Sequence, residues 1–155
     1  MPDQLNQLPL PLPDALRQWL TVNVEFHVVL CHAADCQHAL TPASTSRHLR
    51  DKHQAKIEAQ RQADEYIKQW QWLYDFRSVP LPPDQSLPQP GLPVSRGFQC
   101  TKCGFTSQSR KILQTHGIRE HNQKRLKDRQ PFKPVQLQTW FSEKRARYWA
   151  VDATR

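Results

Sequence analysis

Four of the seven histidines and all four cysteines fall into two groups whose spacing is typical of tetrahedral metal sites. The later group is Cys100-x2-Cys103-x12-His116-x4-His121. Two thiolates this close converge on one ion when a β-hairpin turns between them, and two histidines on a following helix complete the tetrahedron. We interpret this group as a structural zinc site of the ββα (C2H2) type, with Phe98, Phe105 and Leu113 as the small core beneath it.

The earlier group is Cys31-x4-Cys36-x11-His48-x4-His53, with a wider cysteine interval and a middle interval one residue shorter. Its cysteine spacing is at the wide end of the range for zinc sites. Thr45 stands where the later group has Leu113, and Leu49 is a candidate to compensate. His32 is an alternative ligand to Cys31, although thiolates bind zinc more strongly. We therefore predict two structural zinc ions, one for each group.

Both histidine pairs are five residues apart rather than four. Five residues turn an α-helix through about 500°, which leaves the two side chains roughly 140° apart in projection. We therefore expect the last helical turn to widen before the second histidine, which Gly117 makes easier in the later group. Metal binding and folding are coupled in modules this small, so removal of zinc is expected to unfold at least the later one.

The ligand sets favour binding over catalysis. Catalytic zinc sites keep an open position for water, whereas four protein ligands close the coordination shell. The sequence also contains no HExxH pattern and no glycine-rich phosphate loop. We therefore expect no enzymatic activity and no small-molecule substrate.

The elements that position these ligands must be small. The 155 residues are 37% hydrophobic and include 13 prolines but only 4 glycines, which favours metal-stabilised modules over one large core. The predicted fold class is a small α+β protein with two separated ββα modules, joined by a long helix and a proline-rich spacer. The predicted segments are a proline-rich lead and short helix (1–21), the first finger (22–54), an amphipathic helix (55–78), the spacer (79–94), the second finger (95–123) and a basic, aromatic C-terminal segment (124–155).

Several local signals place the secondary structure. Val22–Leu30 is the strongest strand candidate, and Thr41-Pro42 predicts a helix start because proline is well suited to the first helical position. Helical character then continues, with a break, to about Phe76. The other predicted elements are a short helix after Asp14, a hairpin over Gly97–Phe105 and a helix over Ser109–His121. The apolar side of residues 57–74 is either a core-packing surface or a docking surface for a partner protein.

Charge is distributed unevenly along the chain. Residues 1–94 hold 8 Lys/Arg and 10 Asp/Glu, whereas residues 95–155 hold 14 and 4, a net charge of +10. A basic half favours a polyanionic partner because phosphate contacts release condensed counterions, although a merely soluble basic surface is an alternative. The candidate nucleic-acid contacts are Arg47, Arg110, Lys111, Arg119, Lys124, Arg125, Lys127 and Arg129, with DNA favoured over RNA.

Sequence-specific reading of a duplex is not expected. The base-reading helix positions of the second finger hold Ser109, Ile112 and Thr115, and those of the first hold Thr41, Ser44 and Arg47, of which only Arg47 is a typical guanine reader. The 46 residues between the modules also prevent reading of successive triplets. The C-terminal aromatics Trp140, Phe141, Tyr148 and Trp149 either stack on unpaired bases or pack as a folded cap.

Three blocks in order, VVLCHAADCQHAL…RHLRDKH, LPVSRGFQCTKCGF…HGIREHN and VQLQTWF, resemble the fungal family of orsellinic-acid biosynthesis cluster protein D-like proteins. The resemblance spans roughly residues 20–151 and implies two separated C2H2-type fingers with the eight ligands named above. Met1–Pro13 has no basic start typical of a signal peptide, and no apolar run approaches the ~20 residues of a membrane span. We expect an intracellular, nuclear protein; the alternative function is a zinc-stabilised adaptor between proteins.

Overall fold

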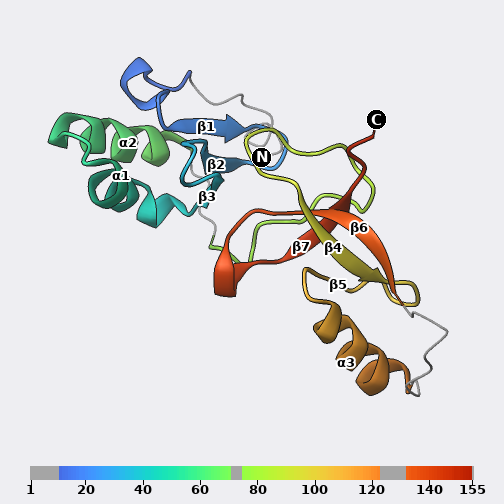
Figure 1. Ribbon diagram of the computed structural model, residues 1–155. Coiled ribbons are helices and arrows are strands. Elements are labelled where there is room, and N and C mark those ends of the chain that lie inside the picture. The colour runs from blue at the N-terminus through green and yellow to red at the C-terminus, as the bar shows by residue number, and fades with distance from the viewer. Residues whose placement is uncertain (1–10, 71–74, 123–131, 155) are drawn as a thin grey trace, which may run out of the picture. The chain divides into compact units, whose positions relative to one another are not determined.

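The computed structural model describes residues 11–70, 75–122 and 132–154, with the exception of the Trp70 side chain. The chain divides into two compact units, residues 1–80 (the first unit) and 81–155 (the second unit), which are considered separately below. Each unit pairs strands with helices, as the α+β prediction requires (Figure 1). Within the described residues, no helix has the length and apolar character needed to cross a membrane.

The first unit contains a three-stranded antiparallel sheet followed by two helices. Its elements are the 3-10 helix η2 (Asp14–Leu16), β1 (Leu20–Asn23), β2 (Val28–Cys31), β3 (His38–Leu40), the 3-10 helix η3 (Pro42–Ser44), α1 (Thr45–His53) and α2 (Ile57–Trp70). The sheet order is β1-β2-β3. Thr41 precedes η3 in an extended conformation with Pro42 at the first position, so the predicted helix start is confirmed, with a first turn of 3-10 type.

The predicted strand over Val22–Leu30 is wrong as a single element, because the chain reverses inside it. Val22 and Val29 are paired across a hairpin whose turn spans residues 24–27. The Asn23 side chain accepts a hydrogen bond from the N–H of Phe26 at 2.9 Å, and His27 has a φ of 56°. An asparagine that binds its own backbone in this way stabilises a turn, which the surrounding β-branched residues hid from the sequence pattern.

The core of the first unit explains the unusual Thr45. Thr45 is fully buried, and its hydroxyl donates to the carbonyl of Thr41 at 2.9 Å, so its polar group is satisfied. Leu49 is also fully buried and supplies the apolar contact that the sequence lacked at position 45. The chain leaves α1 at Gln54, which adopts a left-handed conformation with φ 49°, and this produces the predicted helix break.

Helix α2 covers this core with a row of small side chains and one tyrosine. The buried cluster includes Ala59, Ala63 and Tyr66 of α2 and Ala55 just before it, together with residues from β1, β2, β3 and α1. Their spacing of three or four residues places them on one helix face. Of the residues predicted on this apolar side, Ala63 and Tyr66 are buried and take the packing role, whereas Ile57 is 62% exposed. The Trp70 side chain, Leu73 and Tyr74 lie outside the described residues.

The second unit is a four-stranded antiparallel sheet with one helix. Its elements are β4 (Ser95–Cys100), β5 (Thr106–Ser107), α3 (Arg110–His121), β6 (Phe132–Thr139), the 3-10 helix η4 (Glu143–Arg145) and β7 (Tyr148–Val151), with the sheet order β5-β4-β6-β7. The β4–β5 hairpin and α3 form the predicted finger. In the C-terminal segment, β6 pairs with the edge of β4 that β5 does not occupy (Figure 1). The C-terminal strands therefore extend the sheet of the finger.

The new sheet brings two pairs of residues into close contact. A Cβ atom on Gly97 would overlap Leu137 Cδ1 and lie 2.8 Å from the Ser107 carbonyl oxygen, so only glycine fits here. Trp140 and Trp149 are both 1% exposed, and their ring centroids are 5.0 Å apart. Trp140 and Trp149 therefore pack together inside the second unit, in agreement with the second predicted role, whereas Tyr148 is half-buried.

The proline-rich segment belongs to the second unit and is not a free spacer. The buried Gln138 side chain accepts from the N–H of Gln89 at 2.7 Å and donates to the carbonyls of Gln89 and Leu92. Earlier in the segment, Ser86 forms a parallel bridge with Val151 at the outer edge of β7. These hydrogen bonds tie residues 84–92 to the two C-terminal strands.

Candidate metal centres

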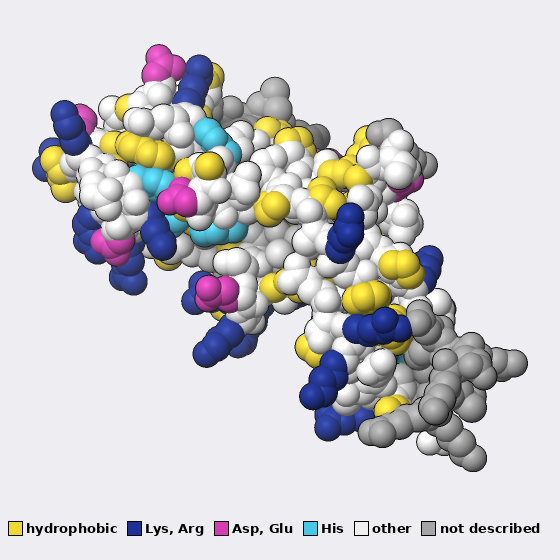
Figure 2. Space-filling view, viewed as in Figure 1, with side chains coloured by type: hydrophobic (Ala, Val, Ile, Leu, Met, Phe, Trp, Pro, Cys, Tyr) yellow, Lys and Arg dark blue, Asp and Glu magenta, His cyan; other side chains and the backbone are white. Residues whose placement is uncertain are grey.

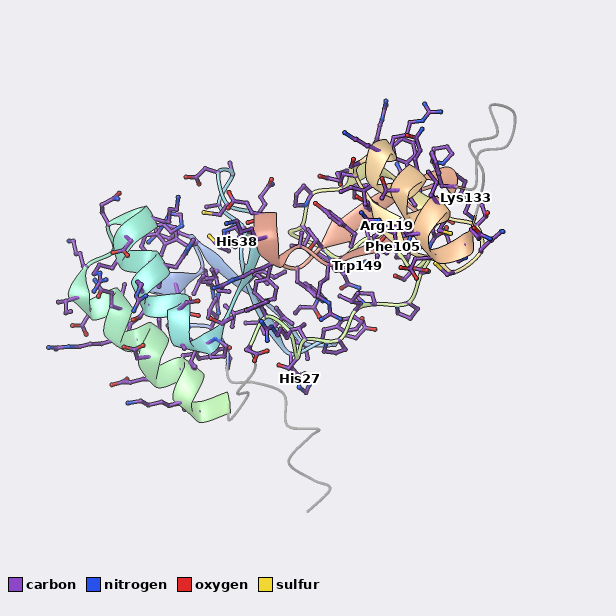
Figure 3. All side chains as sticks on the ribbon, turned by 90° about the horizontal axis from the view of Figure 1, so that it is seen from below. His27, His38, Phe105, Arg119, Lys133 and Trp149 are labelled. Carbon is purple, nitrogen blue, oxygen red and sulfur yellow. The ribbon has the colours of Figure 1, made fainter. Side chains whose placement is uncertain are left out.

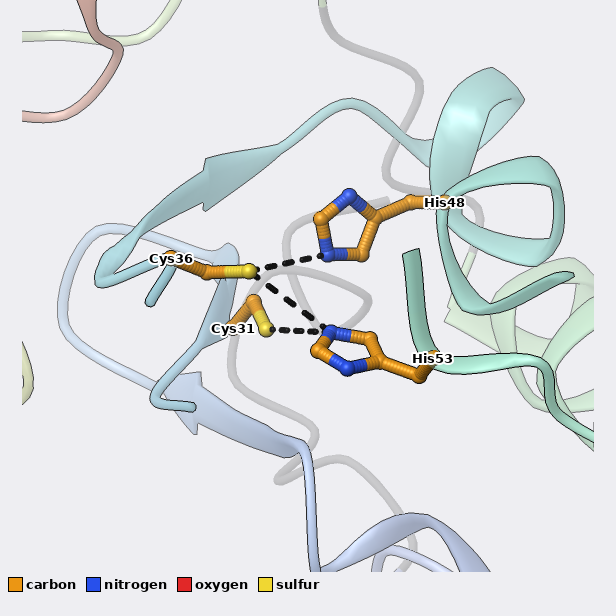
Figure 4. A group of neighbouring side chains, drawn as sticks. All are labelled: Cys31, Cys36, His48 and His53. Carbon is orange, nitrogen blue, oxygen red and sulfur yellow. Dashed lines mark hydrogen bonds between the residues drawn. The ribbon is translucent and has the colours of Figure 1, made fainter. Parts of the chain in front are cut away.

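Among the described residues, each unit contains one group of four ligand atoms that lie within 4.8 Å of one another. In the first metal group, His53 Nε2 lies 3.3 Å from Cys31 Sγ and 3.6 Å from Cys36 Sγ, and His48 Nε2 lies 3.7 Å from Cys36 Sγ (Figure 4). The cysteines come from β2 and the turn after it, and the histidines come from α1. The predicted ligands Cys31, Cys36, His48 and His53 are therefore brought together.

The second metal group has the same arrangement. Cys100 Sγ lies 3.4 Å from His121 Nε2, and Cys103 Sγ lies 3.1 Å from His116 Nε2. Sulfur and nitrogen ligands of a tetrahedral zinc ion, at about 2.3 and 2.0–2.1 Å from the metal, would be separated by about 3.6 Å. The distances in both groups are close to this value, so each Cys2His2 group could hold a metal ion.

Both helices end in the widened turn that the histidine spacing requires. The N–H of Gln54 donates to the carbonyl of Leu49, and the N–H of Asn122 donates to that of Gly117, each spanning five residues instead of four. Both Gln54 and Asn122 have a φ of 49°. As a result, the ring centroids of His48 and His53 lie 5.1 Å apart and those of His116 and His121 lie 5.0 Å apart, with all four Nε2 atoms directed at the cysteines.

The two cysteine turns differ in sequence but reach the same result. In the second group the N–H of Cys100 donates to Phe105 O at 2.7 Å, and Gly104, at φ +82°, donates to Cys100 O. In the first group the longer interval contains a turn in which Cys36 N–H donates to Ala33 O at 2.9 Å, followed by Gln37 at φ 55°. The two extra residues are absorbed in this turn, so the wide spacing does not separate the sulfurs.

The backbone around the two buried cysteines, Cys31 and Cys100, gives their thiols different pKa values. Cys31 is fully buried, and this burial raises the pKa of its thiol to about 12. Burial also acts to raise the pKa of Cys100, but the backbone N–H groups of Cys103 and Lys102 outweigh it and hold that pKa below its usual value. Because metals bind the thiolate, the second group presents its buried cysteine to a metal with less competition from protons.

Two further histidines lie near the first group without joining it. His32 is exposed, and its Nε2 forms a 2.8 Å hydrogen bond with the carbonyl of Arg17, so it does not replace Cys31. His38 Nδ1 lies 3.0 Å from the carbonyl of Ala39, and its ring packs edge-on against His48. Burial, with a smaller contribution from His38, lowers the pKa of His48 to about 4, which keeps the His48 ring neutral and able to bind metal at pH 7.

The small core beneath the second group contains two of its three predicted members, Phe98 and Leu113, but not Phe105. Phe98, Leu113 and Cys100 pack with Phe132 from β6, whose ring centroid lies 5.4 Å from that of Phe98. Phe105, which the sequence placed in this core, is 42% exposed and stacks on the ring of His116. Strand β6 thus supplies Phe132 to this core from outside the finger, and Phe105 lies at the surface.

The predicted nucleic-acid contacts are only partly within the described residues. Arg47, Arg110, Lys111 and Arg119 are exposed, and Lys and Arg side chains are visible over α3 and the neighbouring strands (Figure 2). The guanidinium of Arg110 lies over the ring of Phe132 at 5.8 Å. Four further predicted contacts, Lys124, Arg125, Lys127 and Arg129, lie outside the described residues.

Comparison with known proteins finds a matching family and one similar protein. The family model for orsellinic acid/F9775 biosynthesis cluster protein D matches residues 18–122, which include both metal groups. The protein of that name from Emericella nidulans is 29% identical over 140 residues, which are 89% of this chain and 26% of that protein. The chain thus spans about a quarter of the length of this relative. No solved structure matches this chain.

Proposed function

This chain belongs to the orsellinic acid/F9775 biosynthesis cluster protein D family, and from its two Cys2His2 groups we propose that it is a zinc-stabilised module that binds nucleic acid. Zinc is the proposed metal because two thiolates and two imidazoles in a tetrahedral shell are its usual structural ligands. With four protein ligands the shell is closed, so the ion would support folding and carry no chemistry. A catalytic role is therefore not part of the proposal.

The exposed cations of the second unit carry the nucleic-acid proposal. Arg110, Lys111 and Arg119 project from α3, and Arg96 and Lys133 lie exposed on β4 and β6. Contacts of this kind neutralise phosphates and need no particular base sequence. Base-edge reading is disfavoured because the Ser109 hydroxyl accepts the N–H of Ile112 as a helix cap and Ile112 is apolar. We propose DNA as the partner, which makes the nucleus the expected location.

A salt series tests this function. The zinc-loaded chain should bind duplex and single-stranded DNA at low salt, with an affinity that falls steeply as salt is raised. Replacement of Lys111 and Arg119 by Ala should weaken binding to all sequences and reduce the salt slope by about 2. Glu58→Gln on α2, which removes an exposed acidic group from the first unit, is a control that should change little. No binding at low salt would eliminate the proposal.

The competing proposal is a zinc-stabilised adaptor between proteins. It predicts oligomers or complexes that persist at high salt, because apolar burial is not screened. The apolar residues of α2 and the C-terminal segment were its predicted docking surfaces. Ala59, Ala63, Trp140 and Trp149 are buried inside their own units, whereas Ile57 is 62% exposed, so among the described residues Ile57 is the part of the α2 surface open to a partner.

A further inference from the structure

Phe105 is an aromatic side chain on the surface of the second unit, held in a fixed orientation by a metal ligand. Its ring stacks on that of His116 with a centroid separation of 4.4 Å and an interplanar angle of 14°. The residue nevertheless remains 42% exposed. One face of the ring is thus covered by His116, and the exposed area leaves the ring accessible to a second planar group.

A shallow hollow lies on the same side of α3. It is lined by Lys111, Ile112, Thr115, His116, Arg119 and Glu120. His116 lies four residues after Ile112 and three before Arg119, so these side chains share one helix face with the ring on which Phe105 stacks. Figure 3 shows Phe105 and Arg119 beside α3. An exposed aromatic therefore adjoins two cations, Lys111 and Arg119, and one carboxylate, Glu120.

We propose that Phe105 is a stacking platform for an unpaired base, with Lys111 and Arg119 contacting the neighbouring phosphates of a single strand. This deepens the proposed function and depends on it. Exposed aromatics beside cations bind single strands with little sequence preference, because every base has a planar face. In a duplex the bases are already stacked on one another and offer no such face. The pair His116–Phe105 would be extended by the base into a stack of three rings.

Charge favours this occupant over a protein segment. Residues 95–155 carry a net charge of +10, and the cations at the hollow outnumber the carboxylate by two to one. A single-stranded nucleic acid supplies both the planar group and the anion that the site lacks. Glu120 opposes the phosphates, so Glu120→Gln should strengthen binding at low salt.

The test measures the affinity of the zinc-loaded full chain for three probes of equal length. These are a thymidine single strand of about twelve nucleotides, a duplex, and a single strand of abasic sugar-phosphate units. Fluorescence anisotropy should show tighter binding to the thymidine strand than to the other two. Phe105→Leu should weaken binding to the thymidine strand by ~5-fold or more and leave the abasic strand unaffected, because stacking is lost and phosphate contacts remain. Phe105→Tyr should retain the wild-type affinity.

Matched variants separate stacking from general surface change. Ile118→Ala alters a residue of α3 that is 45% exposed and does not line the hollow, so it should leave binding unchanged. Lys111→Ala and Arg119→Ala should weaken binding to the thymidine strand and to the abasic strand by similar factors. Lys144→Ala removes an equal charge from η4 and should have a smaller effect. Metal content is measured for every variant because Phe105 covers a ligand.

The outcomes distinguish the two levels of the proposal. Absence of binding to all three probes overturns the nucleic-acid function itself. Binding that does not distinguish the thymidine strand from the abasic strand, or that Phe105→Leu leaves intact, overturns the stacking platform and leaves phosphate binding in place. If Phe105→Leu does not retain its metal, Phe105→Trp is measured instead. Its larger ring should bind the thymidine strand more tightly than the wild-type protein does, and an unchanged or lower affinity would contradict stacking.

Discussion

The two metal groups use the same ligands and the same widened helix end, yet the protein around them differs. In the first unit, fully buried Cys31 is part of a cluster that also includes Leu16, Leu49 and Tyr66. In the second, Cys103 is exposed, and the core beneath the site consists of Cys100, Leu113 and Phe132, with Phe98 at its margin. The first metal would be added to a core that already exists, whereas the second would form a large part of the core itself.

This difference suggests how one ligand pattern can serve two structural roles. Where α2 and the sheet bury α1, apolar contacts stabilise the helix whether or not a metal is bound. Helix α3 has only Leu113 as a buried apolar side chain and must rely on the ion for its attachment to the sheet. We therefore expect the two units to respond differently to loss of metal, to loss of apolar contacts and to pH.

The largest expected difference follows from removing a ligand. Cys100→Ser should reduce the metal content from two ions to one and abolish amide protection along α3, since structural zinc contributes about 10 kcal/mol or more to folding in small fingers. Cys36→Ser should also remove one ion but leave much of the protection in α1, because Leu49 remains buried. Metal analysis and hydrogen exchange check both. Equal loss of protection in α1 and α3 would show that the two units depend on metal alike.

Truncation of the buried leucines Leu49 and Leu113 should affect the two units in the opposite order, with the larger loss of stability in the first unit. Leu49→Ala is expected to destabilise the first unit by about 2–5 kcal/mol in denaturant unfolding, because it opens a cavity in a fully buried site. Leu113→Ala should be seen chiefly as faster loss of zinc to a chelator. Val24→Ala, at a residue 44% exposed, is the control and should cost within about 0.5 kcal/mol. A small effect of Leu49→Ala would contradict the proposed apolar support.

A smaller effect is expected at the sheet that extends the second finger. Gly97→Ala should cost about 1–3 kcal/mol, because the new methyl group meets Leu137 and the fixed carbonyl of Ser107. Thermal unfolding of the zinc-loaded protein measures this cost. When Leu137→Ala is combined with Gly97→Ala, only the part of the lost stability that is due to the overlap with the Leu137 side chain should be recovered. A double-mutant cycle separates this part from the effect of Leu137→Ala alone. Full recovery would mean that the backbone contact does not matter.

The smallest expected effect is a pH dependence specific to the metal-free first unit. The pKa of His48 falls from 6.5 to about 4 on folding, so the unfolded chain binds more protons between these values. Stability is therefore present above pH 6.5 and lost as the pH falls toward 4. Since the His48 ring is half-buried, screening limits the expected loss to ~1 kcal/mol. Thermal melts of the metal-free protein from pH 7 to 4.5 test this, and His48→Gln should flatten the profile.

The ligands and helix ends could be predicted because they depend on local spacing. The pairs Cys100–Cys103 and His116–His121 lie on one hairpin and one helix, and that helix begins after Ser109, within one residue of the predicted start. The ligands of the first site were also predicted, although the spacing of Cys31 and Cys36 is at the wide end of the usual range; the structure accommodates the extra residues within a single turn. Such features need no knowledge of distant parts of the chain.

The rest depends on contacts between residues far apart in the sequence. The exchange of Phe105 for Phe132 could not be foreseen, because it requires that β6 pair with β4 beyond the end of the finger. The composition of the proline-rich segment likewise predicts an extended conformation. Only the hydrogen bonds between this segment and Gln138 show that it is part of the second unit. In both cases the sequence indicated the local conformation correctly but not the partner.

The bridge between Ser86 and Val151 also has a consequence for association between chains. The outer edge of β7 is occupied by residues 85 and 86, with Gln85 N–H donating to Ala150 O and Asp152 N–H donating to Ser86 O. Prolines at positions 82, 83, 88 and 90 lack the N–H groups that a further strand would need. At the other end of the sheet, β5 is only two residues long. Both edges are thus poor templates for strand addition, which protects the second unit against edge-to-edge aggregation.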